Sequence, residues 1–293
     1  MTSFQYFIQL LIDGVTTGFI YSLVGLGFVI VFKSTKILNL AQGEFMMAGA
    51  YVTMAFYNVL RLPFLAAFGL ALIAGYFLGF VVDRVFLRRM VGAPIFAVVM
   101  LTVGLSVLLR GLVGLIWGHD ERTIAVPLFH QIVKAAGFSI NFGSILVIVL
   151  CLALVIGFGL FYKFTKTGTS MRATATDTNS AMVMGIDISR VFSVSWGLSS
   201  LVSVFSGVVL ASITIIKPGM ADFGLKALPA VILGGIDSIL GVILGGIIVG
   251  IMENFIGGYI GGMAQQLSPY VILLVVLIIK PYGLFGTKEI ERL

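Results

Sequence analysis

The chain has 293 residues, of which 59% are hydrophobic and 10% are Asp, Glu, Lys or Arg, and its formal net charge is +6. Soluble domains are about 45–50% apolar and about 25% charged, so this chain has too few charges to cover its surface in water. The composition predicts a polytopic membrane protein and excludes a soluble enzyme and a nucleic-acid-binding module. The single cysteine, Cys151, also excludes an intrachain disulfide.

The apolar runs predict an all-α fold in one transmembrane domain, residues 1–293, with about eight or nine membrane-spanning helices. The first run, 7–32, is followed by Lys33 and Lys36. Because basic residues collect in cytoplasmic loops, the N-terminus is expected outside. The later runs lie at 37–60, 63–86, 95–117, 143–162, 191–216, 228–254 and 267–280.

Polar residues interrupt the first two runs. Asn39, Gln42 and Glu44 stand in the second run, and Asp13 stands in the first. A carboxylate at mid-bilayer costs about 2.5–3.5 kcal/mol, so it normally faces the interior of a helix bundle. Two interpretations remain open: a half-helix that lines a translocation path, and a hydrogen-bond network that joins helices.

A loop at about 118–142 is expected outside the membrane. It contains His119 and His130, but no recognised spacing of metal ligands. We therefore expect no metal there, and a solvated loop that touches a partner. Arg110 lies seven residues before Trp117, and its long stem is expected to reach the outer interface.

The loop at about 163–190 is expected on the cytoplasmic side of the membrane. Ser170 is expected to cap a helix beginning at Met171, and Gly185 to end it. Asp187 or Ser189 is expected to cap the span that begins near Val191.

The apolar residues of this loop leave its role open. Met171, Ala175, Met182 and Met184 give the predicted helix a soft surface able to fill a partner's groove. The other interpretation is a helix that lies on lipid headgroups.

The glycine-rich segment 227–262 is expected to contain a broken or re-entrant helix. Eight plain spans would leave the basic C-terminal tail, with Lys280, Lys288 and Arg292, outside. Each glycine inside a helix also costs about 1 kcal/mol relative to alanine. Asp237 and Ser238 follow glycines in this segment and are further candidates for the path.

No phosphate-binding loop, nucleophile elbow or His/Cys metal array is present in the sequence. We therefore expect no cofactor on this chain, and energy supplied by an ion gradient or by another subunit.

Four segments carry a resemblance to a known family: ILNLAQGEFMMAGAYV (37–52), TKTGTSMRATATDTNSAMVMGIDISRV (165–191), LPAVILGGIDSILGVILGGIIVGIMENF (228–255) and PYGLFG (281–286). Across the whole chain the sequence resembles the LivH-type permease subunits of branched-chain amino acid ABC importers. The resemblance implies a non-catalytic permease of the bacterial inner membrane with broken helices, whose segment 165–190 docks on an ATPase. The docking candidates are Ser170, Met171, Arg172, Ala175, Asp177, Met182 and Gly185.

The resemblance also implies partners: a second permease subunit of LivM type, two ATPases that use ATP and Mg, and a periplasmic binding protein. The family often has His where this chain has Gln42, so a titratable group is not expected there. Related permeases carry urea, amides or aromatic acids, which leaves the cargo open. Other classes remain alternatives: a proton-coupled secondary transporter using Glu44 or Asp237, and a channel.

Overall fold

The computed structural model describes residues 3–90, 92–124, 126, 129, 131–135, 138–280 and 282–286. It divides into two compact units. The first unit is Met1–Val29, Leu128–Val155 and Lys226–Leu293, and the second unit is Ile30–Pro127 and Ile156–Leu225.

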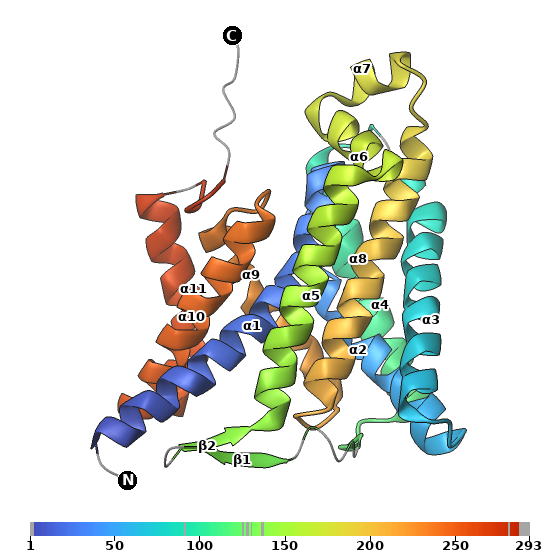
Figure 1. Cartoon of the computed structure of the whole chain (residues 1–293). Helices are drawn as coiled ribbons and strands as arrows, with labels where there is room; N and C mark the ends of the chain where they lie inside the picture. Colours follow the sequence, from blue (N-terminus) through green and yellow to red (C-terminus); the bar gives the residue numbers. More distant parts are fainter. Residues whose placement is uncertain are drawn as a thin grey trace. The chain divides into compact units, whose positions relative to one another are not determined.

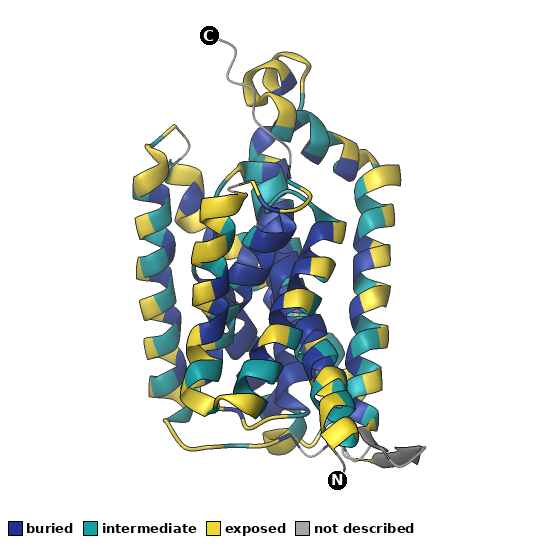
Figure 2. Ribbon diagram, turned by 90° about the vertical axis from the view of Figure 1, so that its left-hand side faces the viewer, coloured by how far each residue is buried: buried dark blue, intermediate teal, exposed yellow. Residues whose placement is uncertain are grey.

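Seven helices of the described part are long and apolar enough to cross a membrane, and they confirm the predicted helical membrane fold (Figure 1). They are α1 (Ser3–Thr35), α3 (Phe64–Val85), α4 (Ile95–Trp117), α5 (Phe142–Phe164), α8 (Ile188–Ala211), α10 (Ile239–Tyr259) and α11 (Gly262–Ile279). Two further apolar helices are short: α2 (Gln42–Met54), which continues as a π-helical turn at Ala55–Val59, and α9 (Asp222–Gly234). Most helices carry exposed residues along one face and buried residues along another (Figure 2).

The apolar run 37–60 is not one continuous helix, because α2 begins only at Gln42. Lys36 has a φ of 57°, in the left-handed region, which ends the preceding helix α1. The Asn39 side chain then accepts a hydrogen bond from the Ala41 backbone N–H at 3.1 Å and holds a turn. The second hydrophobic run therefore forms a half-helix preceded by non-helical chain.

The predicted span 228–254 is likewise two helices, α9 and α10, as the glycine content indicated. Gly235 has a φ of 104°, which favours glycine, and the Ser238 hydroxyl caps α10 by accepting from Gly241 N–H at 3.0 Å. The two helices touch closely, since a Cβ on Gly234 would lie 2.1 Å from the Gly241 carbonyl oxygen. The expected broken piece in 227–262 is confirmed.

The residues after α11 pack against the end of α9 in the first unit. At one end of this unit, the Tyr6 hydroxyl donates to the Gly258 carbonyl at 3.0 Å, and Gly18 packs on Ile247, so α1 and α10 run antiparallel. At the other end, Leu284 N–H donates to the Leu233 carbonyl at 2.7 Å. The segment 282–286 therefore lies at the end of the first unit opposite to Tyr6. Lys288 and Arg292 lie outside the described residues.

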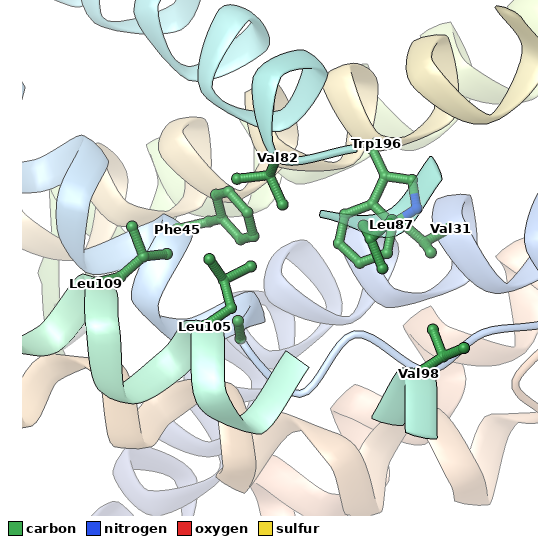
Figure 3. Packing of buried hydrophobic residues seen from close by; sticks show 9 residues of the cluster. Val31, Phe45, Val82, Leu87, Val98, Leu105, Leu109 and Trp196 are labelled. Atoms are coloured by element: carbon green, nitrogen blue, oxygen red, sulfur yellow. The ribbon is translucent and has the colours of Figure 1, made fainter. Parts of the chain in front are cut away.

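Close helix packing forms the core of the second unit. A Cβ on Gly79 of α3 would lie 2.3 Å from the Trp196 carbonyl oxygen of α8, so only glycine permits this approach. Beside this crossing, Phe45, Val82 and Leu105 point toward one another (Figure 3). The full cluster is Val31, Ala41, Phe45, Val82, Leu87, Val98, Leu105, Leu109 and Trp196.

The segment 118–142 contains the one hairpin of the described chain. Strands β1 (Ile132–Ala135) and β2 (Phe138–Asn141) pair antiparallel, with Ile132 opposite Asn141. Among the described residues no group of three or more His, Cys, Asp or Glu is placed to hold a metal ion. His130 lies outside the described residues.

Candidate functional site

A buried amide network surrounds the start of α2. Asn39 Nδ2 and Ser199 Oγ donate to Gln42 Oε1 at 3.0 and 3.1 Å. Gln42 Nε2 donates to Ser203 Oγ at 2.5 Å. All four side chains are buried, so the Gln42 amide makes its hydrogen bonds inside the protein. For Asn39 and Gln42 this geometry favours the network that joins helices over the lining of a path.

Glu44 takes part in a different arrangement, an ion triad with Arg110 and Asp222. Arg110 Nη2 lies 2.9 Å from Glu44 Oε1 and 3.0 Å from Asp222 Oδ1. The Glu44 side chain is 6% exposed, that of Arg110 41% and that of Asp222 56%. Arg110 therefore turns to acids within the second unit rather than to the outer interface, contrary to the prediction.

The depth of the triad restricts what it faces. Arg110 lies seven residues, or about 10 Å of helix rise, before the C-terminal end of α4 at Trp117. Helical side chains point toward the helix N-terminus, so the guanidinium lies deeper still. Exposed charges at this depth face water or a polar protein surface, because contact with hydrocarbon is too costly. The triad thus marks a polar surface inside the membrane.

The N-termini of the two short helices meet beside the triad. A Cβ on Gly43 would lie 2.0 Å from the Ala221 carbonyl oxygen, and one on Gly224 would lie 2.5 Å from Gly43 Cα. Glu44 is in the first turn of α2 and Asp222 in the first turn of α9. Acids are favourable there because a helix N-terminus carries a partial positive charge. Paired half-helices of this kind commonly form the substrate sites of transporters.

The other predicted path residues lie in the first unit. Asp13 is exposed on α1 and accepts a hydrogen bond from Gln9 Nε2 at 3.2 Å. Asp237 stands in the turn between α9 and α10, and Ser238 caps α10. Of the predicted acids, only Glu44 belongs to the triad.

Three acids in the structure, Asp222, Asp83 and Glu253, are not among the residues predicted from the sequence. Asp83 is buried on α3, and its carboxylate accepts from Ser193 Oγ at 2.5 Å. Glu253 is buried on α10, and it accepts from the Tyr21 hydroxyl at 2.5 Å. A rule that every charge inside an apolar run requires a partner would have identified Asp83 and Glu253, but not Asp222, which lies between two runs.

The loop expected at 163–190 forms two helices rather than one, α6 (Lys166–Thr176) and α7 (Thr178–Val183). Thr165 caps α6 by accepting from Gly168 N–H at 3.0 Å. Ser170 lies inside that helix and donates to the Lys166 carbonyl at 3.1 Å, so its predicted capping role is wrong. Both are residue types that cap helices, and the chain uses the earlier one.

Asp177 separates the two helices. Its backbone is extended, and its carboxylate caps α7 by accepting from Asn179 N–H at 2.9 Å and from the Ser180 hydroxyl. These hydrogen bonds lower the pKa of the Asp177 carboxyl. The predicted stop at Gly185, with a φ of 84°, and the predicted cap by Asp187, which accepts from Arg190 N–H at 3.1 Å, are confirmed.

The side chains of the docking candidates differ in how far they are exposed. Val183 and Met184 at the tip of α7 are 89% and 80% exposed, and Met182 is also exposed. Met171 is fully buried, so it is not part of the predicted soft surface. That surface lies at the end of α7, and not along a single helix from Met171.

Arg172 binds back onto α5 rather than pointing outward. Its guanidinium donates to the Tyr162 backbone carbonyl and to Thr169 Oγ1, and its Cζ lies 5.5 Å from the centre of the Tyr162 ring. Such contacts with a backbone carbonyl and an aromatic face fix the side chain. Arg172 therefore joins α6 to the end of α5.

A cavity of about 310 Å³ lies between α7 and the rest of the second unit. Met182 contributes to its wall from α7, and Trp196 from α8. The remaining lining residues are Thr35, Ile37, Asp83, Leu87, Arg88, Met90, Gly92, Ala93, Ile95, Val98, Thr178, Ile188, Ser189 and Phe192. The cavity thus lies between α7 and the ends of α3 and α4.

Comparison with known proteins gives a match along nearly the whole chain. Residues 10–280 match the family model described as branched-chain amino acid transport system / permease component. The chain is 27% identical over its full length to the permease protein BraD of Pseudomonas aeruginosa, covering all of it. It is 28% identical to LivH of Escherichia coli (strain K12), covering 99% of this chain and 98% of LivH. Both are described as permease proteins of high-affinity branched-chain amino acid transport systems.

A more distant relative and one solved structure are also similar. The probable branched-chain amino acid permease LivH of Methanocaldococcus jannaschii is 25% identical, over 92% of this chain and 90% of that protein. The structure of PsaBC from Streptococcus pneumoniae in complex with Fab aligns with 96% of this chain and 94% of its own. Its TM-score is 0.48 and its sequence identity 16%.

Proposed function

Because the chain belongs to the family of permease components of branched-chain amino acid transport systems, we propose that it is the membrane-spanning subunit of an ATP-driven importer that carries branched-chain amino acids. It is a multi-pass protein of the cell inner membrane. The family match over residues 10–280 carries the proposal, because it includes every helix of the triad and the α6–α7 segment.

In this proposal the α6–α7 segment is the docking surface for an ATPase. In Figure 1 both helices lie beyond the ends of α5 and α8. The exposed apolar pair Val183 and Met184 follows the exposed polar residues Asp177, Asn179 and Ser180. A segment with an apolar tip and a polar base can bind in a groove on a water-soluble partner. The segment as a whole is too polar for stable insertion into lipid.

In the same proposal the triad lies on the path of the substrate. A substrate released at the outer face would pass the polar surface formed by Glu44, Arg110 and Asp222. ATP-driven movement of the docked α6–α7 segment would rock the attached helices and switch access from outside to inside.

The proposed complex contains further chains. They are a second permease subunit of LivM type, two ATPases that bind ATP and Mg, and a periplasmic binding protein. This chain supplies no nucleotide site in the proposal, since its sequence has no phosphate-binding loop.

The test is a pull-down from membranes, followed by uptake measurements on the reconstituted complex. Met184→Glu places a charge at the exposed tip, and Met184→Leu keeps the tip apolar as a matched control. We expect the glutamate variant to lose ATPase co-purification and ATP-driven leucine uptake by about tenfold or more, as for the central residue of an interface. The leucine variant should retain both.

Two results would contradict the proposal. Unchanged co-purification and uptake in Met184→Glu would exclude the α7 tip as the docking surface. Uptake by the purified chain alone, driven by a proton gradient, would instead identify a secondary transporter.

A further inference from the structure

The two acids of the triad hold Arg110 in different ways. Glu44 is almost fully buried, whereas more than half of the Asp222 side chain is exposed. Both ion pairs use the same guanidinium nitrogen, Nη2. A guanidinium has five N–H donors in a planar fork, so Arg110 has capacity for another anion while it remains bound to Glu44. The pair with Asp222 is the one that an incoming molecule can reach.

We propose that the Arg110–Asp222 pair is the site that recognises the transported molecule, and that this molecule is a zwitterionic α-amino acid. Its carboxylate pairs with the Arg110 guanidinium, and its ammonium pairs with the Asp222 carboxylate. This proposal rests on the proposed function and extends it by naming the residues that select the cargo.

The opposite charges of Arg110 and Asp222 favour a zwitterion as the bound molecule. Inserted between Arg110 and Asp222, it separates the pair but gives each of them a new partner of opposite charge. Neither charge is left unpaired inside the membrane, where an unpaired charge is costly. A planar guanidinium also matches the two oxygens of a carboxylate.

The same arrangement disfavours the other cargoes of related permeases. One cation and two carboxylates give the triad a net charge of −1, so an aromatic acid would add an anion to a site that is already negative. Urea has no charge to exchange for either member of the pair. The triad therefore selects the amino acid backbone and leaves choice among side chains to other surfaces.

Glu44 is a positioning residue in this scheme. Its burial and its 2.9 Å contact keep Arg110 in place while Asp222 exchanges partners. The start of α2, which carries Glu44, is in turn held by the Gln42 hydrogen bonds to α8 and by the contact of Gly43 with Ala221.

The experiment uses the whole transporter in proteoliposomes, with ATP inside and leucine-loaded binding protein outside. Leucine uptake, stimulated ATP hydrolysis and ATPase co-purification are measured on the same samples. Arg110→Gln and Asp222→Asn should each lower leucine uptake by about tenfold or more, while stimulated ATP hydrolysis and co-purification persist. Arg110→Lys should keep part of the uptake, because it preserves the charge but not the fork.

The matched control is Ser106→Ala on α4, four residues before Arg110. The Ser106 hydroxyl donates to the Val103 carbonyl of its own helix at 2.8 Å and is not part of the triad. Ser106→Ala should leave uptake unchanged. A purely structural triad would lower co-purification and ATP hydrolysis together with uptake, whereas a recognition site lowers the leucine carried per ATP hydrolysed.

Direct binding gives a second readout. Saturation-transfer NMR on the complex without binding protein is recorded with L-leucine, with 4-methylpentanoate, which lacks the ammonium, and with 3-methylbutylamine, which lacks the carboxylate. L-Leucine should give the strongest signal and lose it in both triad variants. Equal signals from the three molecules, or full leucine uptake in Arg110→Gln and Asp222→Asn within an intact complex, would overturn the triad proposal alone. Absence of any ATPase from the wild-type complex would refute the proposed function, and this inference with it.

Discussion

The meeting of the α2 and α9 N-termini leaves no space for a side chain at Gly43. A Cβ at this position would lie 2.0 Å from the Ala221 carbonyl oxygen, and Ala221 is itself buried. The obstacle is backbone, which cannot turn away as a flexible side chain does. Gly43→Ala must therefore push the two helix ends apart, together with Glu44 and Asp222 beside them.

The expected loss follows from the size of that clash. Overpacking of a well-packed site costs about 1–3 kcal/mol, and a backbone obstacle places Gly43→Ala near about 2 kcal/mol or above. At about 2–4 °C per kcal/mol for chains of about 150–250 residues, the apparent melting temperature in detergent should fall by about 4–8 °C. Leucine uptake should fall as well, because the triad is displaced.

The matched control is Gly69→Ala in α3, where a new Cβ meets nothing within 4 Å. Alanine is favoured over glycine inside a helix by about 1 kcal/mol, so this variant should melt at the same temperature or higher. Thermal unfolding followed by size-exclusion chromatography of both variants measures the difference. Equal melting temperatures for the two variants would refute the close contact between the α2 and α9 ends.

Two further predictions concern buried and exposed acids. Ser193→Ala removes the hydroxyl that donates to the buried Asp83 carboxylate, and it should destabilise the protein by about 1–3 kcal/mol. Ser106→Ala, whose hydroxyl bonds only a carbonyl of its own helix, is the control, and equal melting shifts would contradict the prediction. Asp177→Ala removes the cap of α7 and should speed hydrogen exchange of the amides in 178–183. Because hydrogen bonding lowers the pKa of Asp177, this protection is present above the ordinary carboxyl pKa and is lost as pH falls through the lowered pKa. Exchange in the alanine variant as slow as in the wild type at neutral pH would argue against the cap.

The membrane class and the broken C-terminal segment were predictable because they follow from local properties. Apolar runs of sufficient length predict membrane-spanning helices. The excess of glycine and the basic C-terminal tail predicted a break within 227–262, which the structure places at Gly235. The stop at Gly185 and the cap by Asp187 also depend only on adjacent residues.

The triad could not be predicted from local sequence patterns, because its members are far apart in the chain. Arg110 is 66 residues from Glu44 and 112 from Asp222, and only the packing of α2, α4 and α9 brings them together. The start of α6 was also predicted wrongly. Thr165 and Ser170 are both suitable caps, and the helix is capped by Thr165, so it begins earlier than predicted. Met171 then lies inside the helix and is buried.

The central claim is that the exposed side of the triad faces water inside the membrane, as a translocation path requires. It is tested most directly by cysteine accessibility in a Cys151→Ser background, since Cys151 is buried and is the only cysteine of the sequence. Asp222→Cys should react with a water-soluble thiol reagent in the assembled transporter. Ile73→Cys, at an exposed apolar position of α3, should not react. Equal, slow labelling of both variants would contradict the account.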